Sequence, residues 1–257
     1  MKGDTEVILM IIFFFCGAVF AVYAEELSIL PFVNTIIAPL ATLLAAFFGA
    51  KFAFQLQTEK QEKDRIYDEV KYGNKAIFEI IRTYNKFVSI RNQFIDPQRN
   101  NPLRHYFILP ITGVDAHVTN IDFDSLAFLI NTKDPDILNK LSAFQQEANS
   151  TIEVINQRSK MHFDVIQHAV EIAEKTHGSR LSEQQIDAEV GNRYKTVIKS
   201  STDIMVECVD SVIALSEEHV KNLSELLKST YKGHTIIKME IPNESSNLTG
   251  AHNAQSS

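Results

Sequence analysis

Few side chains in this 257-residue sequence combine the type and the spacing that chemistry requires. Asp122 and Asp124 are close in sequence, but the surrounding NIDFDSL lacks the glycine turn and the distal glutamate of a calcium loop, so we interpret both as helix caps. His162 and His168 are six residues apart, whereas two ligands on one helix face are three or four apart. Neither pair predicts a metal site or a catalytic centre.

The rest of the composition also disfavours catalysis and nucleic-acid binding. No G-x-S-x-G, H-E-x-x-H, Walker A or dinucleotide fingerprint occurs in the sequence. The formal net charge is -7 and no long basic run is present, whereas phosphate binding needs clustered Lys and Arg. Cys16 and Cys208 are too few for a disulfide framework or a cysteine-based metal site. We therefore predict no enzyme activity, no cofactor and no direct contact with nucleic acid.

Three arginines and one histidine fall near the apolar stripes of the expected helices. His162 lies on such a stripe, where we interpret it as a buried core histidine. Arg158 precedes it by four residues and is expected to pair with an acidic residue of another helix, and Arg91 and Arg193 also lie near a seam. Because buried arginines in bundles more often fix register than catalyse, we assign these residues structural roles.

The elements that position these residues begin with two apolar stretches. Residues 7–24 carry no charge over about 18 positions, close to the roughly 20 apolar residues that span the hydrocarbon core of a bilayer. Residues 29–54 form the second stretch, and only four residues separate the two. We therefore predict a transmembrane hairpin over residues 1–54, in which small residues allow the two spans to pack side by side.

The second stretch contains residues that are unusual inside a membrane. Pro31, Asn34 and Pro39 interrupt its first part, which we predict to be a distorted or interfacial turn whose backbone groups need other partners. The dense apolar run then extends from residue 36 to residue 54. We therefore predict Pro31, Asn34 and Pro39 to be polar or kink positions embedded in the membrane.

Charge predicts the side of the membrane on which the rest of the chain lies. The hairpin loop carries two glutamates, whereas four basic residues lie at the end of the second stretch or after it: Lys51, Lys60, Lys63 and Arg65. The positive-inside rule therefore predicts that both termini are cytoplasmic. A cleaved signal peptide is the alternative for the first span, because Val22 and Ala24 form a small-residue cleavage pattern. An uncleaved hairpin is favoured, since two acids offset the one lysine in the first six residues.

The region after the apolar stretches is typical of long amphipathic helices. From residue 51 to 95 the chain has no proline, and apolar residues at three-, four- and seven-residue steps line one face. A second helix is predicted over residues 135–175, ended by Gly178, and a third over 182–228, started by the capping box of Ser182 and Gln185. The sequence thus predicts an all-α fold, with an elongated cytoplasmic antiparallel bundle or coiled coil over residues 55–242.

Two other segments of this region were assigned from composition and turn residues. Residues 236–241 are expected to form a short strand or to dock as an extended tail. Residues 243–257 are rich in Asn and Ser and are predicted to be a disordered tail.

One long connection separates the first two helices, between residues 96 and 120. Its prolines and glycine break the helical period, and it carries the apolar run Tyr106, Phe107, Ile108 and Leu109. We expect this connection to pack on the helices, and we take the four apolar residues as a candidate interaction patch. A short helix is predicted next, over residues 123–130, with Asp122 or Asp124 as its cap.

Two runs between Phe87 and His162, FVSIRNQFIDPQRNNPLRHYFI and IDFDSLAFLINTKDPDILNKLSAFQQEANSTIEVINQRSKMH, resemble a group of uncharacterised bacterial membrane proteins with a leading transmembrane hairpin. The resemblance implies a bacterial inner-membrane setting and no activity. Separately, the layout of two spans and a cytoplasmic domain is similar to that of membrane effectors in antiphage systems such as retrons, an analogy of architecture alone.

Two functional hypotheses follow from the sequence. The first is an integral inner-membrane protein whose helical domain acts as a scaffold, binding a protein partner or a second copy of itself. The alternative is a membrane-disrupting effector of an antiphage defence system, held inactive until a signal frees the hairpin to oligomerise. Asn34, which lies between two prolines of the second span, motivates this alternative. The lipid bilayer is a partner under both hypotheses.

Overall fold

The structure is a computed structural model that describes residues 16–17, 19, 38–113, 119–178 and 181–239. Every element in these ranges is helical, which confirms the all-α prediction. The chain divides into two compact units, Met1–Arg65 and Ile66–Ser257. Most of the first predicted span, Pro31, Asn34 and the tail at 243–257 lie outside the described residues.

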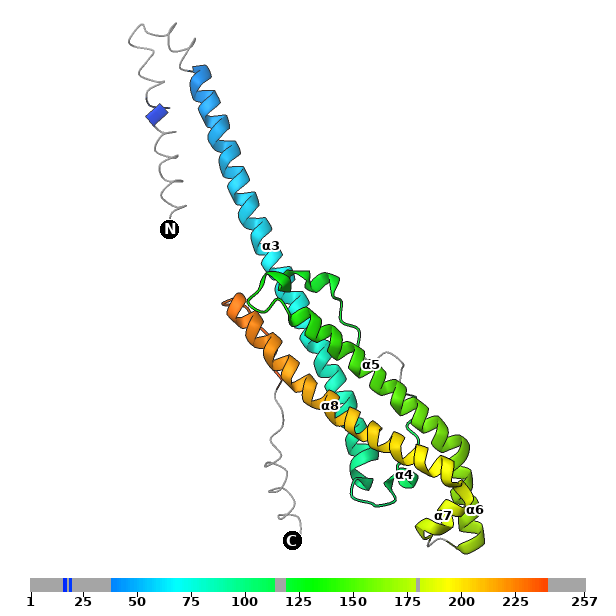
Figure 1. Ribbon diagram of the computed structural model, residues 1–257. Coiled ribbons are helices and arrows are strands. Elements are labelled where there is room, and N and C mark those ends of the chain that lie inside the picture. The colour runs from blue at the N-terminus through cyan, green and yellow to red at the C-terminus, as the bar shows by residue number, and fades with distance from the viewer. Residues whose placement is uncertain (1–15, 18, 20–37, 114–118, 179–180, 240–257) are drawn as a thin grey trace, which may run out of the picture. The chain divides into compact units, whose positions relative to one another are not determined.

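Helix α3, Ala38–Ile90, contributes to both units and is 53 residues long (Figure 1). The described part of the second apolar stretch continues without a break into the following helix. Pro39 lies in the first turn, where its missing N–H removes no helical hydrogen bond. In the second unit, α3 provides core residues such as Ile77, Ile80 and Phe87, which are fully buried.

Short elements follow α3, and the helical run ends close to residue 96, where the sequence predicts the connection to begin. A π-helical turn, Arg91–Ile95, leads into a 3-10 turn, Asp96–Gln98, and Pro97 lies in the latter. The four-residue helix α4 is Arg104–Phe107. The predicted short helix is a 3-10 helix, Asp124–Asn131.

Asp122 caps this 3-10 helix, as one of the two alternatives predicts. Its carboxylate accepts hydrogen bonds from the Ser125 N–H at 3.3 Å and from the Ser125 hydroxyl at 2.7 Å. Asp124 lies in the first turn, where a negative charge faces the positive end of the helix. Both aspartates are therefore explained by the helix start.

The second long helix consists of two α-helices joined by a π-helical turn. Helix α5, Ile137–Met161, passes through a π-helical turn, His162–Ile166, into α6, Gln167–His177. Gly178 ends α6 at a φ of 85°, as predicted, because glycine adopts this left-handed conformation without a Cβ clash. The π turn inserts one residue into the helical repeat and so changes the face on which later side chains lie.

The third predicted helix is interrupted. The capping box of Ser182 and Gln185 starts α7, Glu183–Val190, as predicted. However, the prediction of one helix over residues 182–228 is wrong, because Gly191 adopts φ 78° and ψ 146° and separates α7 from α8, Asn192–Thr230. This conformation is open almost only to glycine.

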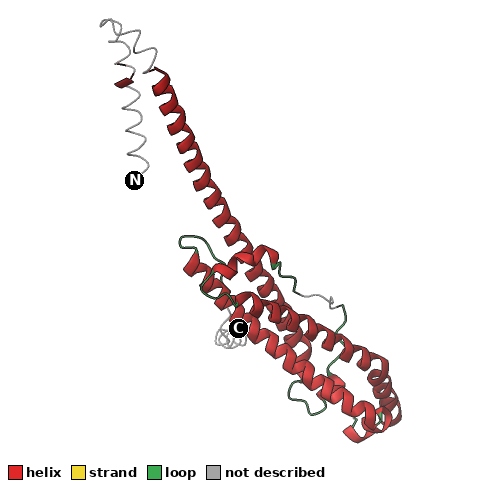
Figure 2. Ribbon diagram, turned by 45° about the horizontal axis from the view of Figure 1, so that its top comes forward, coloured by secondary structure: helices red, strands yellow, loops and turns green. Residues whose placement is uncertain are grey.

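The second unit is built from three long helices that lie side by side. One main apolar core is buried between three helices: the part of α3 from residue 66 on, α5 and α8 (Figures 1 and 2). Helices α5 and α8 are antiparallel, since Glu147 bonds Ser211 while Arg158 bonds Thr202. A smaller cluster joins α4, α6, α7 and α8 through six buried side chains: Tyr106, Ile166, Ala169, Ile186, Val190 and Ile198.

The segment after α8 docks in an extended conformation on α3. The Asn74 side chain donates to the Thr235 carbonyl at 3.0 Å and accepts from the Ile237 N–H at 2.9 Å, and Ile236 between them is buried. Of the two alternatives predicted for this segment, the described residues up to 239 form the extended tail.

Candidate functional site

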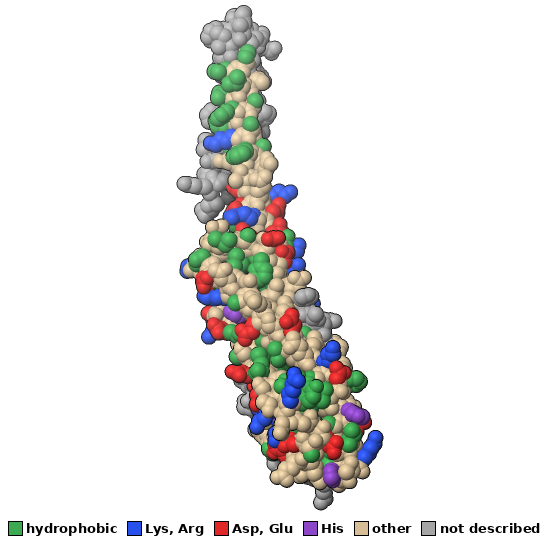
Figure 3. All heavy atoms as spheres, turned by 45° about the vertical axis from the view of Figure 1, so that its right-hand side comes forward, with side chains coloured by type: hydrophobic (Ala, Val, Ile, Leu, Met, Phe, Trp, Pro, Cys, Tyr) green, Lys and Arg blue, Asp and Glu red, His purple; other side chains and the backbone are tan. Residues whose placement is uncertain are grey.

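The first half of α3 exposes an unusual amount of apolar surface. Seven of its large apolar side chains are between 42% and 71% exposed: Leu40, Leu43, Leu44, Phe47, Phe48, Phe54 and Leu56. Figure 3 shows hydrophobic side chains along the N-terminal part of the helix on the face that is in view. In the described part of the chain, α3 is the one helix long and apolar enough to cross a membrane. A contiguous apolar surface of this size indicates contact with lipid or with another protein.

The predicted interaction patch divides into two exposed and two buried residues. Phe107 and Leu109 are 36% and 64% exposed, whereas Tyr106 and Ile108 are 2% and 0% exposed. The four residues are therefore not one continuous exposed patch. The expectation that this connection packs on the helices is confirmed, because Tyr106 of α4 and Ile108 and Ile111 after it are buried.

Arg158 of α5 is the largest side chain that is fully buried. It donates to the Leu109 carbonyl from Nη1 and to the His105 carbonyl from Nη2, both at 3.2 Å, and to the Thr202 hydroxyl from Nε at 3.3 Å. The predicted acidic partner is wrong, since none of the described carboxylates contacts it. Two of its three partners are main-chain carbonyls, and the carbonyl of His105 belongs to the single turn of α4.

Two neighbours of Arg158 contact the same segment. The Ser159 hydroxyl accepts from the Ile111 N–H at 3.0 Å, and Nε2 of His162 lies 2.7 Å from the Tyr106 carbonyl. Because a carbonyl only accepts, this nitrogen carries the proton. We call Arg158, Ser159 and His162 the main-chain clamp, since together they fix the backbone of residues 105–111. His162 is buried, as the prediction of a core histidine requires.

Burial shifts the pKa values of the clamp residues and of their neighbours. It lowers the pKa of the Arg158 guanidinium to about 10, which still leaves the group charged at neutral pH. Burial also lowers the pKa of His162, and the charge of Arg158 lowers it further. For Tyr106, burial and a hydrogen bond to Asp187 at 2.7 Å raise the pKa.

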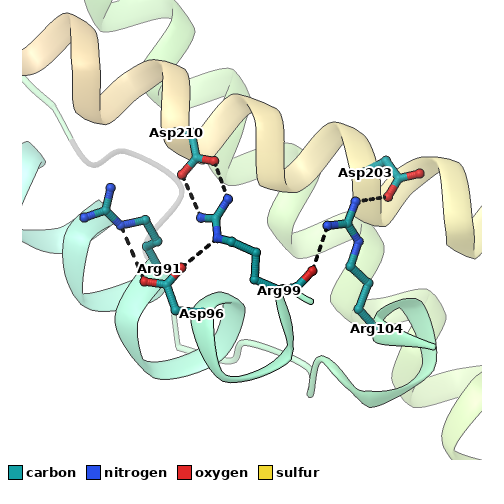
Figure 4. A network of polar contacts seen from close by, with 6 residues as sticks. All are labelled: Arg91, Asp96, Arg99, Arg104, Asp203 and Asp210. Carbon is teal, nitrogen blue, oxygen red and sulfur yellow. Dashed lines mark hydrogen bonds and ion pairs between the residues drawn. The ribbon is translucent and has the colours of Figure 1, made fainter. Parts of the chain in front are cut away.

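Ion pairs attach the residues just before this segment to α8 (Figure 4). Arg99 makes a bidentate pair with Asp210, at 2.8 and 3.0 Å, and also bonds Asp96 at 2.9 Å. Arg104 pairs with Asp203 at 2.6 Å and donates to the Arg99 carbonyl. Residues 96–111 are thus held by α8 through carboxylates and by α5 through the main-chain clamp.

The two other arginines singled out from the sequence, Arg91 and Arg193, are partly buried and exposed, respectively. Arg91 lies 3.8 Å from Asp96, near the seam where the sequence places it, and Arg193 is exposed on α8. Among the described residues there is no group of three His, Cys, Asp or Glu side chains that could hold a metal ion. A cavity lined by Tyr72, Glu79 and Asn120 measures about 10 Å³, the size of one water.

Sequence reasoning missed the main-chain clamp. Arg158 and His162 were found as polar residues on an apolar stripe, but their partners are carbonyls of a distant loop, and backbone partners leave no sequence signal. No protein-family model, curated protein or solved structure matches this sequence.

Proposed function

We propose that this is an integral protein of the bacterial inner membrane that uses its cytoplasmic helical domain to bind a protein partner or a second copy of itself. In this proposal the first half of α3 is the second span of a hairpin. The observation that carries it is one helix whose first part is apolar and exposed, while its later part supplies fully buried core residues such as Ile77 and Phe87. Exposure of so many apolar side chains to water is unfavourable, and contact with lipid removes this free-energy cost.

The interaction role is supported by apolar side chains on the surface of the second unit. Tyr194, Val197 and Ile204 of α8 are 44%, 44% and 47% exposed. They follow one another at three- and seven-residue steps, which places them on one face of the helix. Large apolar residues that gather on one exposed helix face are typical of a protein-binding surface.

A variant pair on α8 tests this role in detergent-extracted full-length protein. We expect Val197→Glu with Ile204→Glu to leave the helical CD signal unchanged, because both positions are exposed, and to abolish a stoichiometric partner or self-association. Thr196→Glu introduces one such charge at an exposed polar position of the same helix and serves as the control. Equal complexes in all variants, measured by light scattering and by mass spectrometry of co-purified proteins, contradict the proposal.

The membrane-disrupting alternative has a separate readout. Membrane potential is measured with a voltage-sensitive dye after induction of the chain alone and with its genomic neighbours. Depolarisation under either condition supports the effector hypothesis over the scaffold. An unchanged potential under both conditions agrees with a scaffold.

A further inference from the structure

Two buried histidines lie next to the buried guanidinium of Arg158. His105 and His162 are 2% and 3% exposed, and each has one ring nitrogen, Nε2 and Nδ1 respectively, without a hydrogen-bond partner in the described part of the chain. The His105 carbonyl accepts from Arg158, and its ring lies 4.1 Å from that of Tyr106. This part of the core therefore contains the positive charge of Arg158 and two histidine rings whose neutral form is favoured by burial.

Protonation of His162 would place a charged N–H without a partner in the core, although the hydrogen bond to the Tyr106 carbonyl itself favours the protonated ring. The neutral ring already donates from Nε2 to the Tyr106 carbonyl, so an added proton goes to Nδ1, which faces no acceptor. A buried N–H without a partner loses its hydrogen bonds to water and gains none in return, and this penalty is larger when the group is charged. The second charge would also lie beside Arg158, in an interior that screens repulsion poorly.

Charges from the surrounding helices do not remove this penalty. From α8, Lys199 disfavours a charged His105, while Asp203 favours it; from α7, Glu183 and Asp187 also favour it. However, Asp203 is paired with Arg104, and both acids of α7 are paired with Lys195. The pKa of each histidine is lowered, mainly by burial. For His162 the charge that contributes is that of Arg158 on its own helix.

We propose that His105 and His162 make the attachment of residues 104–111 to α5 an acid-sensitive latch. At neutral pH the uncharged rings allow the main-chain clamp to hold the segment. When the rings take up protons, the segment leaves α5 and uncovers Tyr106, Ile108 and Ile111, which are buried in the closed form. This inference does not depend on the proposed function, because it concerns contacts within the second unit.

The size of the effect follows from linkage. A released histidine has a pKa of about 6.5, so at pH 5.5 each ring that must be neutral favours the open form by up to roughly 10-fold relative to pH above 6.5. Two rings together favour it by up to about 100-fold. The closed form is therefore weakened progressively as the pH falls from 6.5 to 5.5.

Hydrogen exchange of the full-length protein in detergent tests the latch. We expect the amides of Tyr106 and Ile108, whose N–H groups bond main-chain carbonyls, to lose at least about 10-fold protection between pH 7.5 and 5.5, after correction for intrinsic exchange. Amides of α3 between residues 76 and 88 should keep theirs. His162→Gln, which retains a neutral donor, should lose clearly less, whereas His168→Gln, at an exposed position of α6, should behave like the wild type.

Three outcomes overturn the latch: an equal loss in wild type and His162→Gln, a loss spread uniformly over the core of α3, or no loss at pH 5.5. If His162→Gln does not fold, NMR titration of the His162 ring in the wild type replaces it. The ring protonation and the loss of protection at Tyr106 should then have the same midpoint. Midpoints more than one pH unit apart contradict the proposal.

Discussion

At the scale of single residues, the unusual feature is a buried cation that has no carboxylate partner. Removing a guanidinium from water is expensive, and a nearby acid normally offsets that cost. Here Arg158 has two carbonyl partners and one hydroxyl partner instead. Its planar group has several donors in fixed directions, so one side chain can bond two carbonyls of a loop and a hydroxyl of α8. Arg158 thereby fixes the loop relative to both helices.

Replacing Arg158 should therefore destabilise the second unit strongly. We expect Arg158→Ala to lower the free energy of unfolding by about 3–5 kcal/mol, because it leaves a cavity and two unpaired carbonyls. Lys160→Ala, at an exposed position two residues away, should change it by less than about 0.5 kcal/mol. Urea unfolding of the full-length protein in detergent, followed by CD, measures both. Similar values for the two variants would mean that the clamp contributes nothing to stability.

A third buried histidine gives the main core its own pH dependence. His219 contacts Phe144 edge to face at a centroid distance of 5.3 Å, and burial lowers its pKa. Since the unfolded ring binds a proton near pH 6.5 and the folded ring at lower pH, stability is full above 6.5 and falls as the pH drops below it. His219→Leu should reduce this loss between pH 6.5 and 5.5 by up to about 1.4 kcal/mol.

Urea unfolding at several pH values between 7.5 and 5.5 checks this prediction, with His168→Leu as the exposed control. An identical pH dependence for the wild type and His219→Leu would show that the buried ring takes up no proton on unfolding.

At the scale of elements, local signals in the sequence located most helix boundaries. Gly178 and the capping box of Ser182 and Gln185 act within one turn, so the residues that cause these boundaries are visible in sequence. The break at Gly191 was missed because apolar periodicity continues on both of its sides. The π turn at 162–166 was missed for a similar reason, since an inserted residue is determined by packing rather than by composition.

A close approach of α3 and α8 provides an element-scale prediction. A Cβ at Gly73 would lie 2.6 Å from Cδ1 of Leu227, a fully buried side chain. We expect Gly73→Ala to destabilise by about 1–3 kcal/mol through overpacking, although alanine is the better helix former. In Leu227→Ala, the same change at position 73 should cost much less, because the methyl group enters the space that the leucine leaves.

A double-mutant cycle of Gly73→Ala and Leu227→Ala, measured by urea unfolding, gives the coupling between the two positions. A coupling energy of at least about 1 kcal/mol is expected for side chains in direct contact. Additive effects would mean that the two helices are not in contact at this position.

At the scale of the whole molecule, the account depends on lipid as the solvent of the first part of α3. Seven large apolar side chains there are more than two-fifths exposed, while the later turns of the same helix are fully buried on one face. The helix content and the continuity of α3 could be predicted because long apolar runs and helical periodicity are visible in the sequence of the helix itself. The binding partner could not, since an exposed helix face specifies an apolar contact but not which protein makes it.

Membrane fractionation of the full-length chain tests this central claim most directly. Lysed cells are centrifuged at high speed, and the pellet is washed with alkaline carbonate and then extracted with detergent. The account predicts that the chain stays in the carbonate-washed pellet and enters the supernatant only with detergent, and that Leu43→Arg with Phe47→Arg weakens this retention, because each charge inside a bilayer costs about 2.5–3.5 kcal/mol. Recovery of the wild-type chain in the first, detergent-free supernatant would contradict it.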